Sequence, residues 1–404
     1  MPTAPGAPAI AMVSYNATPD RGSDTAVGDE QARHVAELAA GLSALGFAVT
    51  TFTRRASRRE PERSTSPGGG TVVRLTAGPV RPLNTAELLT HLGEFTDRLT
   101  THLRSGGFAA AHAHHWTSGV AAALAARSLP TRVLVTHHAF AGAGRGEHAP
   151  LERRVALTAD RVLATSAAEV DHLVGLGVPR TSVSVVPGGV DIGVFTIPDG
   201  QPHAKTGQLL VAPAPLVRGQ GVDTAIAVLP RLPDVRLVVA GHGPDETRLR
   251  AAAARLGVLD RVRFTGAVTR AELAELFRAA DLVLRGPAQD PHGALALQAS
   301  ACGAPVLASP VGALADVVVD GITGRHVRPG SAAALHAALR DLLADPHRLA
   351  GMGLAGADRA ASRYSWARVA AEVSRAYRGP AEHPTEAALG TGTTAEPAAE
   401  ESCP

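Results

Sequence analysis

The sequence predicts an α/β protein with two doubly wound parallel sheets that follow one another along its 404 residues. Short apolar runs alternate with segments of helical periodicity, which is the pattern of a parallel sheet with helices on both faces. A polar stretch over 197–207 interrupts the alternation, which then restarts. Each half is long enough to bury its own core. We therefore expect two Rossmann-like domains with a ligand site in the cleft between the carboxyl edges of their sheets.

The first expected domain spans 9–196 and follows an N-terminal tail over 1–8. Its expected strands are IAMVS, FAVTTFTRR, VVRLT, FAAAHAHH, RVLVTHHAF, DRVLATS and VSVVPGGVD. A helix is expected from Gln31, because Val35, Leu38, Leu42 and Leu45 recur at helical spacing. AELLTHLGEFTDRLTTHLRSG is expected to form the next helix. The polar, Gly/Pro-rich residues 56–70 predict a surface loop.

The second expected domain spans 208–363, with strands QLLVAPA, VRLVVAG, VRFTG, DLVLRG and PVLAS. SWARVAAEVSRAY predicts a further helix over 364–378, since Trp366, Val369, Val373 and Tyr377 recur at helical spacing for docking. Residues 379–404 have no apolar periodicity, and we expect them to be disordered.

Composition argues against several classes of function. The net charge of +2 is too small, and the arginines too scattered among carboxylates, for a nucleic-acid-binding protein. Two cysteines offer no disulfide framework. No apolar run reaches the roughly 18 residues of a transmembrane helix, and the N-terminus lacks a signal-peptide pattern. We therefore expect a cytoplasmic protein with no transmembrane segment and no nucleic-acid partner.

Several stretches, in order along the chain, narrow the function. VSYNATPD, HAHHWTSG and VSVVPGGVDIGVF in the first half resemble retaining glycosyltransferases of family 4, in the branch of sucrose-phosphate synthase and mycothiol glycosyltransferase. GHGP, DRVRFTGAV and DPHGALALQASACGAPVLASPVGALADVVVDGITG do the same in the second half. The resemblance spans about residues 9–378. It implies a GT-B fold, a nucleotide-sugar donor on the second domain, and a last helix that crosses back onto the first.

The resemblance also implies a donor site from which this chain departs. Family members stabilise the leaving diphosphate with an Arg and a Lys in a loop reading G-R-L-V-x-x-K-G, and here these positions are Pro215 and Gln220. A Gly-Gly pair that lets the backbone approach the phosphates is replaced by Asp29 and Glu30. Cations are lost and carboxylates are added, so we expect weak or lost transfer.

Other implied site positions are kept or changed conservatively. The two family glutamates, which face the donor sugar and the ribose hydroxyls, correspond to Asp290 and Gln298. Gln298 can still hydrogen-bond a hydroxyl but carries no charge. The family histidine near the transferred sugar corresponds to His138, which with Asp290 makes the candidate catalytic pair. Further expected donor-binding residues are Gly266 and Val268 beside the base, Gly293, Ala294 and Leu295 at a helix N-terminus, and Gln220 and Arg218 in the phosphate loop.

The histidines of HAHH and THH raise the alternative of a zinc site. No Asp, Glu or Cys lies among them, and both segments resemble family members that need no metal there. We therefore expect no metal and no cofactor.

Two functional hypotheses remain open. The first is a pseudo-glycosyltransferase that senses a nucleotide sugar or binds an active homologous transferase. The alternative is an active retaining transferase in which Arg218 replaces the missing cations. Loops that would recognise a phosphorylated acceptor carry Asn84, Thr85 and a single arginine, Arg145. A sugar-phosphate acceptor is therefore not expected.

Overall fold

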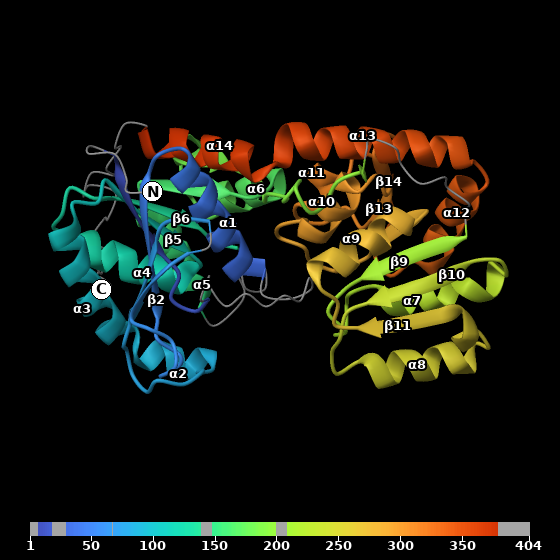
Figure 1. Cartoon of the computed structure of the whole chain (residues 1–404), viewed down its shortest axis with the longest axis horizontal. Helices are drawn as coiled ribbons and strands as arrows, with labels where there is room; N and C mark the ends of the chain where they lie inside the picture. Colours follow the sequence, from blue (N-terminus) through green and yellow to red (C-terminus); the bar gives the residue numbers. More distant parts are fainter. Residues whose placement is uncertain (1–6, 18–29, 67, 139–147, 199–207, 379–404) are drawn as a thin grey trace, which may run out of the picture.

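Two α/β halves lie side by side in the computed structural model, which describes residues 7–17, 30–66, 68–138, 148–198 and 208–378 (Figure 1). The first contains an eight-stranded sheet of order β3-β4-β2-β1-β5-β6-β7-β8 within these ranges, and the second a six-stranded sheet of order β11-β10-β9-β12-β13-β14. Helices α13 and α14 run along one side of the molecule (Figure 1). The predicted fold class, two parallel-sheet α/β domains, is confirmed.

The first sheet contains all seven strands that the sequence predicts and one more. Their bounds are β1 Ala9–Val13, β2 Ala48–Arg54, β3 Arg63–Thr65, β4 Thr71–Leu75, β5 Ala110–His114, β6 Arg132–Thr136, β7 Arg161–Ala164 and β8 Val183–Val185. Strand β3 pairs antiparallel with β4 at the sheet edge. The expectation of loop throughout 56–70 is therefore wrong for these three residues, whose polar sequence carries no strand signal.

The helices of the first half mostly follow the predicted pattern. They are α1 Glu30–Ala44, α2 Thr85–Thr90, α3 Leu92–Gly106, α4 Trp116–Ala126, α5 Ala149–Thr158 and α6 Ala167–Gly175. Leu45 follows the end of α1 and is exposed, so its placement on the apolar face is wrong. The single helix expected before β5 is divided at His91, which ends α2 and precedes α3.

The second half adds six strands and eight helices to the described part of the chain. The strands are β9 Leu209–Pro213, β10 Arg236–Ala240, β11 Val262–Gly266, β12 Leu282–Arg285, β13 Val306–Ala308 and β14 Gly324–His326. The helices are α7 Val222–Val228, α8 Glu246–Arg255, α9 Arg270–Ala279, α10 Ala294–Ala301, α11 Leu314–Val317, α12 Ala332–Leu343, α13 Pro346–Tyr364 and α14 Trp366–Arg378.

Helix α14 belongs to the end of the chain but packs on the first half. Its buried Val369, Val373 and Tyr377 share one hydrophobic cluster with residues of β1 and α1. The Tyr377 hydroxyl lies 2.8 Å from Nδ1 of His112 in β5, and Arg132 donates to the Tyr377 carbonyl at 3.0 Å. Gly41 of α1 is needed for this packing, since a Cβ there would lie 2.8 Å from the Cβ of Ala370. The last helix thus ties the two halves together.

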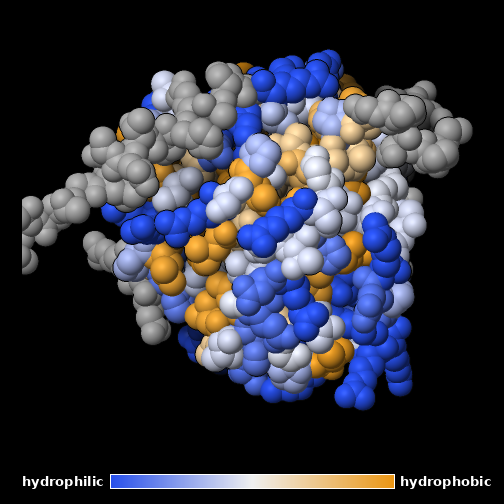
Figure 2. All heavy atoms as spheres, turned by 90° about the vertical axis from the view of Figure 1, so that its left-hand side faces the viewer, coloured by the Kyte–Doolittle hydropathy of each residue, from blue (hydrophilic) through white to orange (hydrophobic). Residues whose placement is uncertain are grey.

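The surface of the first half is mixed in character. Figure 2 shows hydrophobic residues scattered among hydrophilic ones on the end of the molecule that this half forms. Within the described ranges, no helix combines the length and the apolar character that a membrane crossing requires.

Candidate functional site between the two halves

A pocket with an empty volume of about 410 Å³, part of it open to solvent, lies between the two halves. Both halves and the segment that joins them contribute side chains. The lining residues are Glu30, Arg33, His34 and Glu37 of α1, Gly188, Gly189 and Asp191, Arg270 of α9, His292, Ala294 and Gln298 around α10, and Trp366 of α14. The predicted positions Glu30, Ala294 and Gln298 are therefore brought together here, in a cleft between the halves as the doubly wound topology leads one to expect.

The start of α10 is built around the carboxylate of Asp290. Gly293 is the N-cap and has a φ of 63°, a backbone conformation that glycine adopts without strain. Its N–H donates to Oδ1 of Asp290 at 2.7 Å. Oδ2 of Asp290 accepts from Arg285 at 2.7 Å, and both side chains are buried. Helix α10 begins where the sequence predicts, but one of its free amides is already bonded to Asp290.

Glu30 brings a second carboxylate close to Asp290. The pKa of Glu30 is raised to about 7, chiefly by burial and also by the negative charge of Asp290, while Arg285 and Arg33 act in the opposite direction. At neutral pH, the negative charge of a carboxylate with this pKa is poorly compensated by its surroundings. The position predicted to match a family glycine thus carries an acidic side chain that lines the pocket between the halves.

Gln298 provides an uncommitted polar group in the same pocket. Its side chain is buried, and its Oε1 has no hydrogen-bond partner among the residues described. Buried polar atoms normally have partners, because leaving one unpaired costs about 1–3 kcal/mol. An amide in this state is suited to a hydroxyl of a bound ligand, which agrees with the role predicted for this position.

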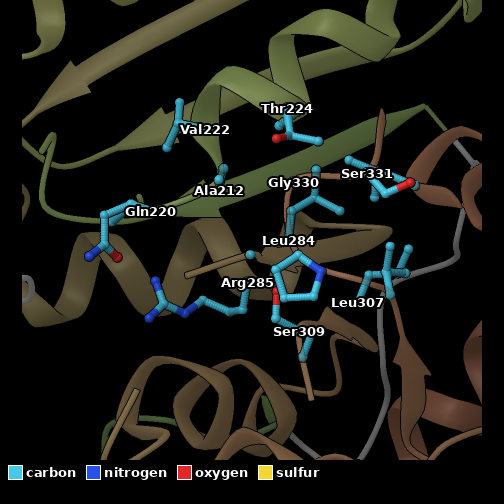
Figure 3. Close-up of a pocket in the computed structure, with 18 of the residues that line it drawn as sticks. Ala212, Gln220, Val222, Thr224, Leu284, Arg285, Leu307, Ser309, Gly330 and Ser331 are labelled. Carbon is cyan, nitrogen blue, oxygen red and sulfur yellow. The ribbon is translucent and has the colours of Figure 1, made fainter. Parts of the chain in front are cut away.

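Gln220, from the loop predicted to bind phosphate, lies at a second pocket, of about 460 Å³, within the second half. Gln220 and Arg285 both line it, and Figure 3 shows their polar ends at the same end of the pocket. Arg285 also donates to the carbonyl of Pro213 at 2.6 Å. This cation was missed by the sequence reasoning. The available signal was a charged residue ending the buried apolar strand LVLR.

Arg218, the predicted replacement cation, has a different environment. It is exposed, whereas Pro215 in the same loop is partly buried. The pKa of Asp245, beside the start of α8, is lowered chiefly by its hydrogen bond from Arg248 and also by the charge of Arg218. Arg218 is therefore close enough to Asp245 to interact with it.

The remaining predicted residues are divided between several places. Gly266 ends β11 with a φ of 71°, and Val268 is buried behind it. Neither lines the pocket between the halves. Asp29 and Arg145 lie outside the described residues. The donor-binding roles of Gly266, Val268 and Leu295 stay predictions.

His138 does reach the junction of the two halves. It follows β6 with a φ of 64°, and it is buried. Its Nε2 lies 2.8 Å from Nδ1 of His114, and its Nδ1 lies 3.0 Å from Nε2 of His292 in the second half. His292 and His34, which also line the pocket, were not singled out from the sequence. The catalytic role of His138 stays a prediction.

Replacing Glu30 by glutamine is expected to change the pH dependence of stability. The pKa of Glu30 rises from 4.5 in the unfolded chain to about 7 in the folded chain. The folded chain therefore binds this proton more tightly, and the free energy of unfolding falls as the pH rises from 4.5 through 7. Glu30→Gln stays neutral and should exceed the wild type at pH 8 by up to about 3 kcal/mol, at 1.36 kcal/mol per pKa unit. Urea unfolding at pH 5 and pH 8 measures this.

At pH 5 the difference between the two proteins should shrink to less than about 1 kcal/mol, because the Glu30 carboxyl is then mostly protonated in the folded chain. The exposed Glu275 provides the matched control, and Glu275→Gln should show no comparable pH-dependent gain. A Glu30→Gln variant whose advantage is the same at both pH values would contradict this assignment.

Comparisons with known proteins agree with this architecture. Residues 31–194 match the family model described as Glycosyltransferase Family 4, and residues 195–359 match that described as Glycosyl transferases group 1. The D-inositol 3-phosphate glycosyltransferase of Xylanimonas cellulosilytica is 33% identical over 402 residues, covering 92% of this chain and 96% of the relative. That of Stackebrandtia nassauensis is 32% identical and covers 91% and 90%.

Solved structures give the same result for the fold. Sucrose-phosphate synthase from Thermosynechococcus elongatus superposes with a TM-score of 0.80 at 26% identity, covering 92% of this chain and 98% of that one. Anabaena HepE in complex with UDP and glucose has a TM-score of 0.72 at 17% identity, with coverage of 92% and 99%. The chain therefore belongs to the family 4, group 1 glycosyltransferases and has their GT-B fold.

Proposed function

We propose that this chain is a pseudo-glycosyltransferase, which binds a nucleotide sugar weakly and transfers its sugar slowly or not at all. The observation that carries the proposal is the buried ion pair of Arg285 and Asp290. Pro215 and Gln220 provide no charge to a leaving diphosphate, and Arg285, the buried cation that lines the pocket with Gln220, is already paired with a carboxylate. Arg328 lines the same pocket but is exposed. Stabilisation of that charge is a large part of catalysis in such a reaction.

The carboxylate of Glu30 adds to this argument. It lines the pocket with Ala294, and the N-terminus of α10 is where a phosphate is expected to bind. A negative side chain at this point opposes an incoming diphosphate by a few kcal/mol at an effective dielectric constant of about 20. Loss of one oxyanion-stabilising donor alone typically costs about 10²–10³ in rate. We also propose that any transfer by this chain proceeds with retention of configuration, the course expected in an active relative.

The alternative, active transfer with Arg218 as the replacement cation, receives less support. Arg218 is exposed, and its charge acts on Asp245. The protein without turnover would serve as a sensor of nucleotide sugars or as a partner of an active homologous transferase.

The relatives' names include inositol 3-phosphate, and for this chain we consider it only as a candidate acceptor. In the loop predicted to meet the acceptor, Asn84 caps α2 through its bond from the Glu87 N–H at 3.0 Å. Arg81 is paired with the same Glu87 at 2.7 Å. Since Arg81 is already paired, these contacts support an acceptor other than a sugar phosphate.

A panel of UDP, GDP, ADP and their sugars tests the donor site by thermal shift and calorimetry. The wild type should bind each with a Kd above about 1 μM, an affinity weaker than about −8 kcal/mol. Pro215→Arg with Gln220→Lys, Asp29→Gly and Glu30→Gly should bind at least one of them about tenfold more tightly, because cations are restored and carboxylates removed.

Arg218→Ala is the matched control and should leave donor binding unchanged. A large loss of binding or turnover in that variant would favour the alternative. Submicromolar binding of a nucleoside diphosphate by the wild type, or transfer at a rate typical of enzymes, about 1 s⁻¹ or more, would refute the proposal.

A further inference from the structure

Four buried imidazoles meet where the two halves join. His34 lies in α1, His114 ends β5 and His138 follows β6, so three come from the first half. His292, just before α10, comes from the second. The ring centroid of His34 lies 4.9 Å from that of His138, 5.5 Å from that of His292 and 5.2 Å from that of Trp366, whose ring is edge-on to it.

Three of these rings are close enough to share one ion. His34, His138 and His292 each offer a nitrogen, and these three atoms lie within 4.8 Å of one another. Zinc binds imidazole nitrogens at about 2.0–2.1 Å in a tetrahedral arrangement, which places ligand atoms about 3.3 Å apart. The hydrogen-bonded pair of His138 and His292 is already at 3.0 Å. Metal binding therefore requires the rings to move so that the third nitrogen, within 4.8 Å of the other two, comes to the same distance.

We propose that His34, His138 and His292 form a binding site for a divalent transition-metal ion of the zinc class, which links the two halves of the chain. Imidazole is a preferred ligand of Zn²⁺, Cu²⁺ and Ni²⁺. Three protein ligands leave one coordination position for water or a small ligand. The adjoining pocket, with the carboxylate of Glu30 in its lining, lies beside His34 and His292. The site shares His138 with the predicted catalytic pair and borders the pocket between the halves, and metal binding is measured separately from sugar binding and transfer.

The hydrogen bonds around the cluster leave nitrogen atoms without partners. A neutral imidazole has one N–H and one lone pair. Hydrogen bonds join His114 to His138 and His138 to His292, so His114 and His292 each use one ring nitrogen. The other nitrogens, Nε2 of His114 and Nδ1 of His292, are buried and have no hydrogen-bond partner within the described part of the chain. Neither atom faces the ion when His138 binds through Nδ1 and His292 through Nε2, so the support for the site is the approach of the three rings.

His114 is placed to support His138 as a ligand. Metal-bound histidines usually donate their second N–H to an acceptor that fixes the ring and its tautomer. Nδ1 of His114 lies 2.8 Å from Nε2 of His138, so it can accept that proton while Nδ1 of His138 faces the ion. The φ of 64° at His138 is a backbone conformation found mainly at turns and functional sites.

All three rings are buried where the two halves meet. Glu37 and Asp191 in the lining are already paired with Arg270.

The full chain, freed of metal with a chelator, is to be titrated with Zn²⁺ by calorimetry and with Co²⁺ by visible absorption. One equivalent should bind, with the d–d bands of a four-coordinate cobalt ion. His292→Phe and His34→Phe keep an aromatic ring in place and should bind more than about 100-fold more weakly. His114→Phe removes only the supporting acceptor and should weaken binding by about 10–100-fold.

His347→Phe, at an exposed position in the first turn of α13, is the matched control and should bind like the wild type. X-ray absorption of the zinc-loaded wild type should count three imidazole nitrogens at about 2.0–2.1 Å, a readout that needs no variant to fold. The proposal is overturned by the absence of saturable binding of both ions, by unchanged affinity in His34→Phe and His292→Phe, or by fewer than three imidazoles at the bound zinc.

Discussion

A chain that ends at residue 363 is expected to lose its cooperative fold, because α14 is then missing. Val369, Val373 and Tyr377 of this helix are buried against β1 and α1. Each large apolar side chain contributes about 1.5–3 kcal/mol when fully buried. The sum for these three is comparable to the free energy of unfolding of a typical domain, about 5–15 kcal/mol. The truncation also removes the tyrosine hydroxyl that bonds the buried His112.

Circular dichroism during heating and limited proteolysis measure this effect. The control ends at residue 380 and keeps α14, while it removes 381–404, which have no apolar periodicity. The control should melt cooperatively at the wild-type temperature. Equal resistance of the two truncations to protease would mean that α14 is dispensable, and that the two halves are joined by other contacts.

The fold could be predicted from the sequence because its signals are local. Apolar runs such as RVLVT and LLVAP are strands in the structure, since a strand of a parallel sheet is buried on both faces and reads as continuous apolar sequence. Strand β3 could not be predicted, because RST becomes a strand only through its pairing with β4. The break between α2 and α3 at His91 likewise follows from tertiary packing, which overrides helix propensity.

The candidate site was predictable only in part. The resemblance to the family placed Asp290, Gly293 and Gln298 around α10, as the structure has them. His292 and His34 could not be paired from the sequence, because 258 residues of numbering separate two side chains that meet only when both halves are folded. Arg285 was also missed. Its partner Asp290 lies five residues away, across a turn whose geometry the sequence does not specify.

Arg285→Met is expected to destabilise the protein by about 3–5 kcal/mol, the usual cost of removing one partner of a buried ion pair. Both side chains of the Arg285–Asp290 pair are buried, so the Asp290 carboxylate is left in a poorly solvated site. It keeps the N–H of Gly293 as a hydrogen-bond donor to Oδ1. Urea denaturation, compared with the wild type, measures the loss in the free energy of unfolding.

Replacing both partners should be far less harmful than replacing one. In Arg285→Met with Asp290→Asn no charge remains buried, and the amide oxygen of the asparagine can still accept from Gly293, so most of the lost stability should return. Arg98→Met removes the exposed pair with Glu94 in α3 and serves as the control, with an expected cost below about 1 kcal/mol. If Arg285→Met costs no more than Arg98→Met, then Arg285 is not needed to neutralise Asp290. Its charge is then free for a phosphate, and the chief support for weak transfer is lost.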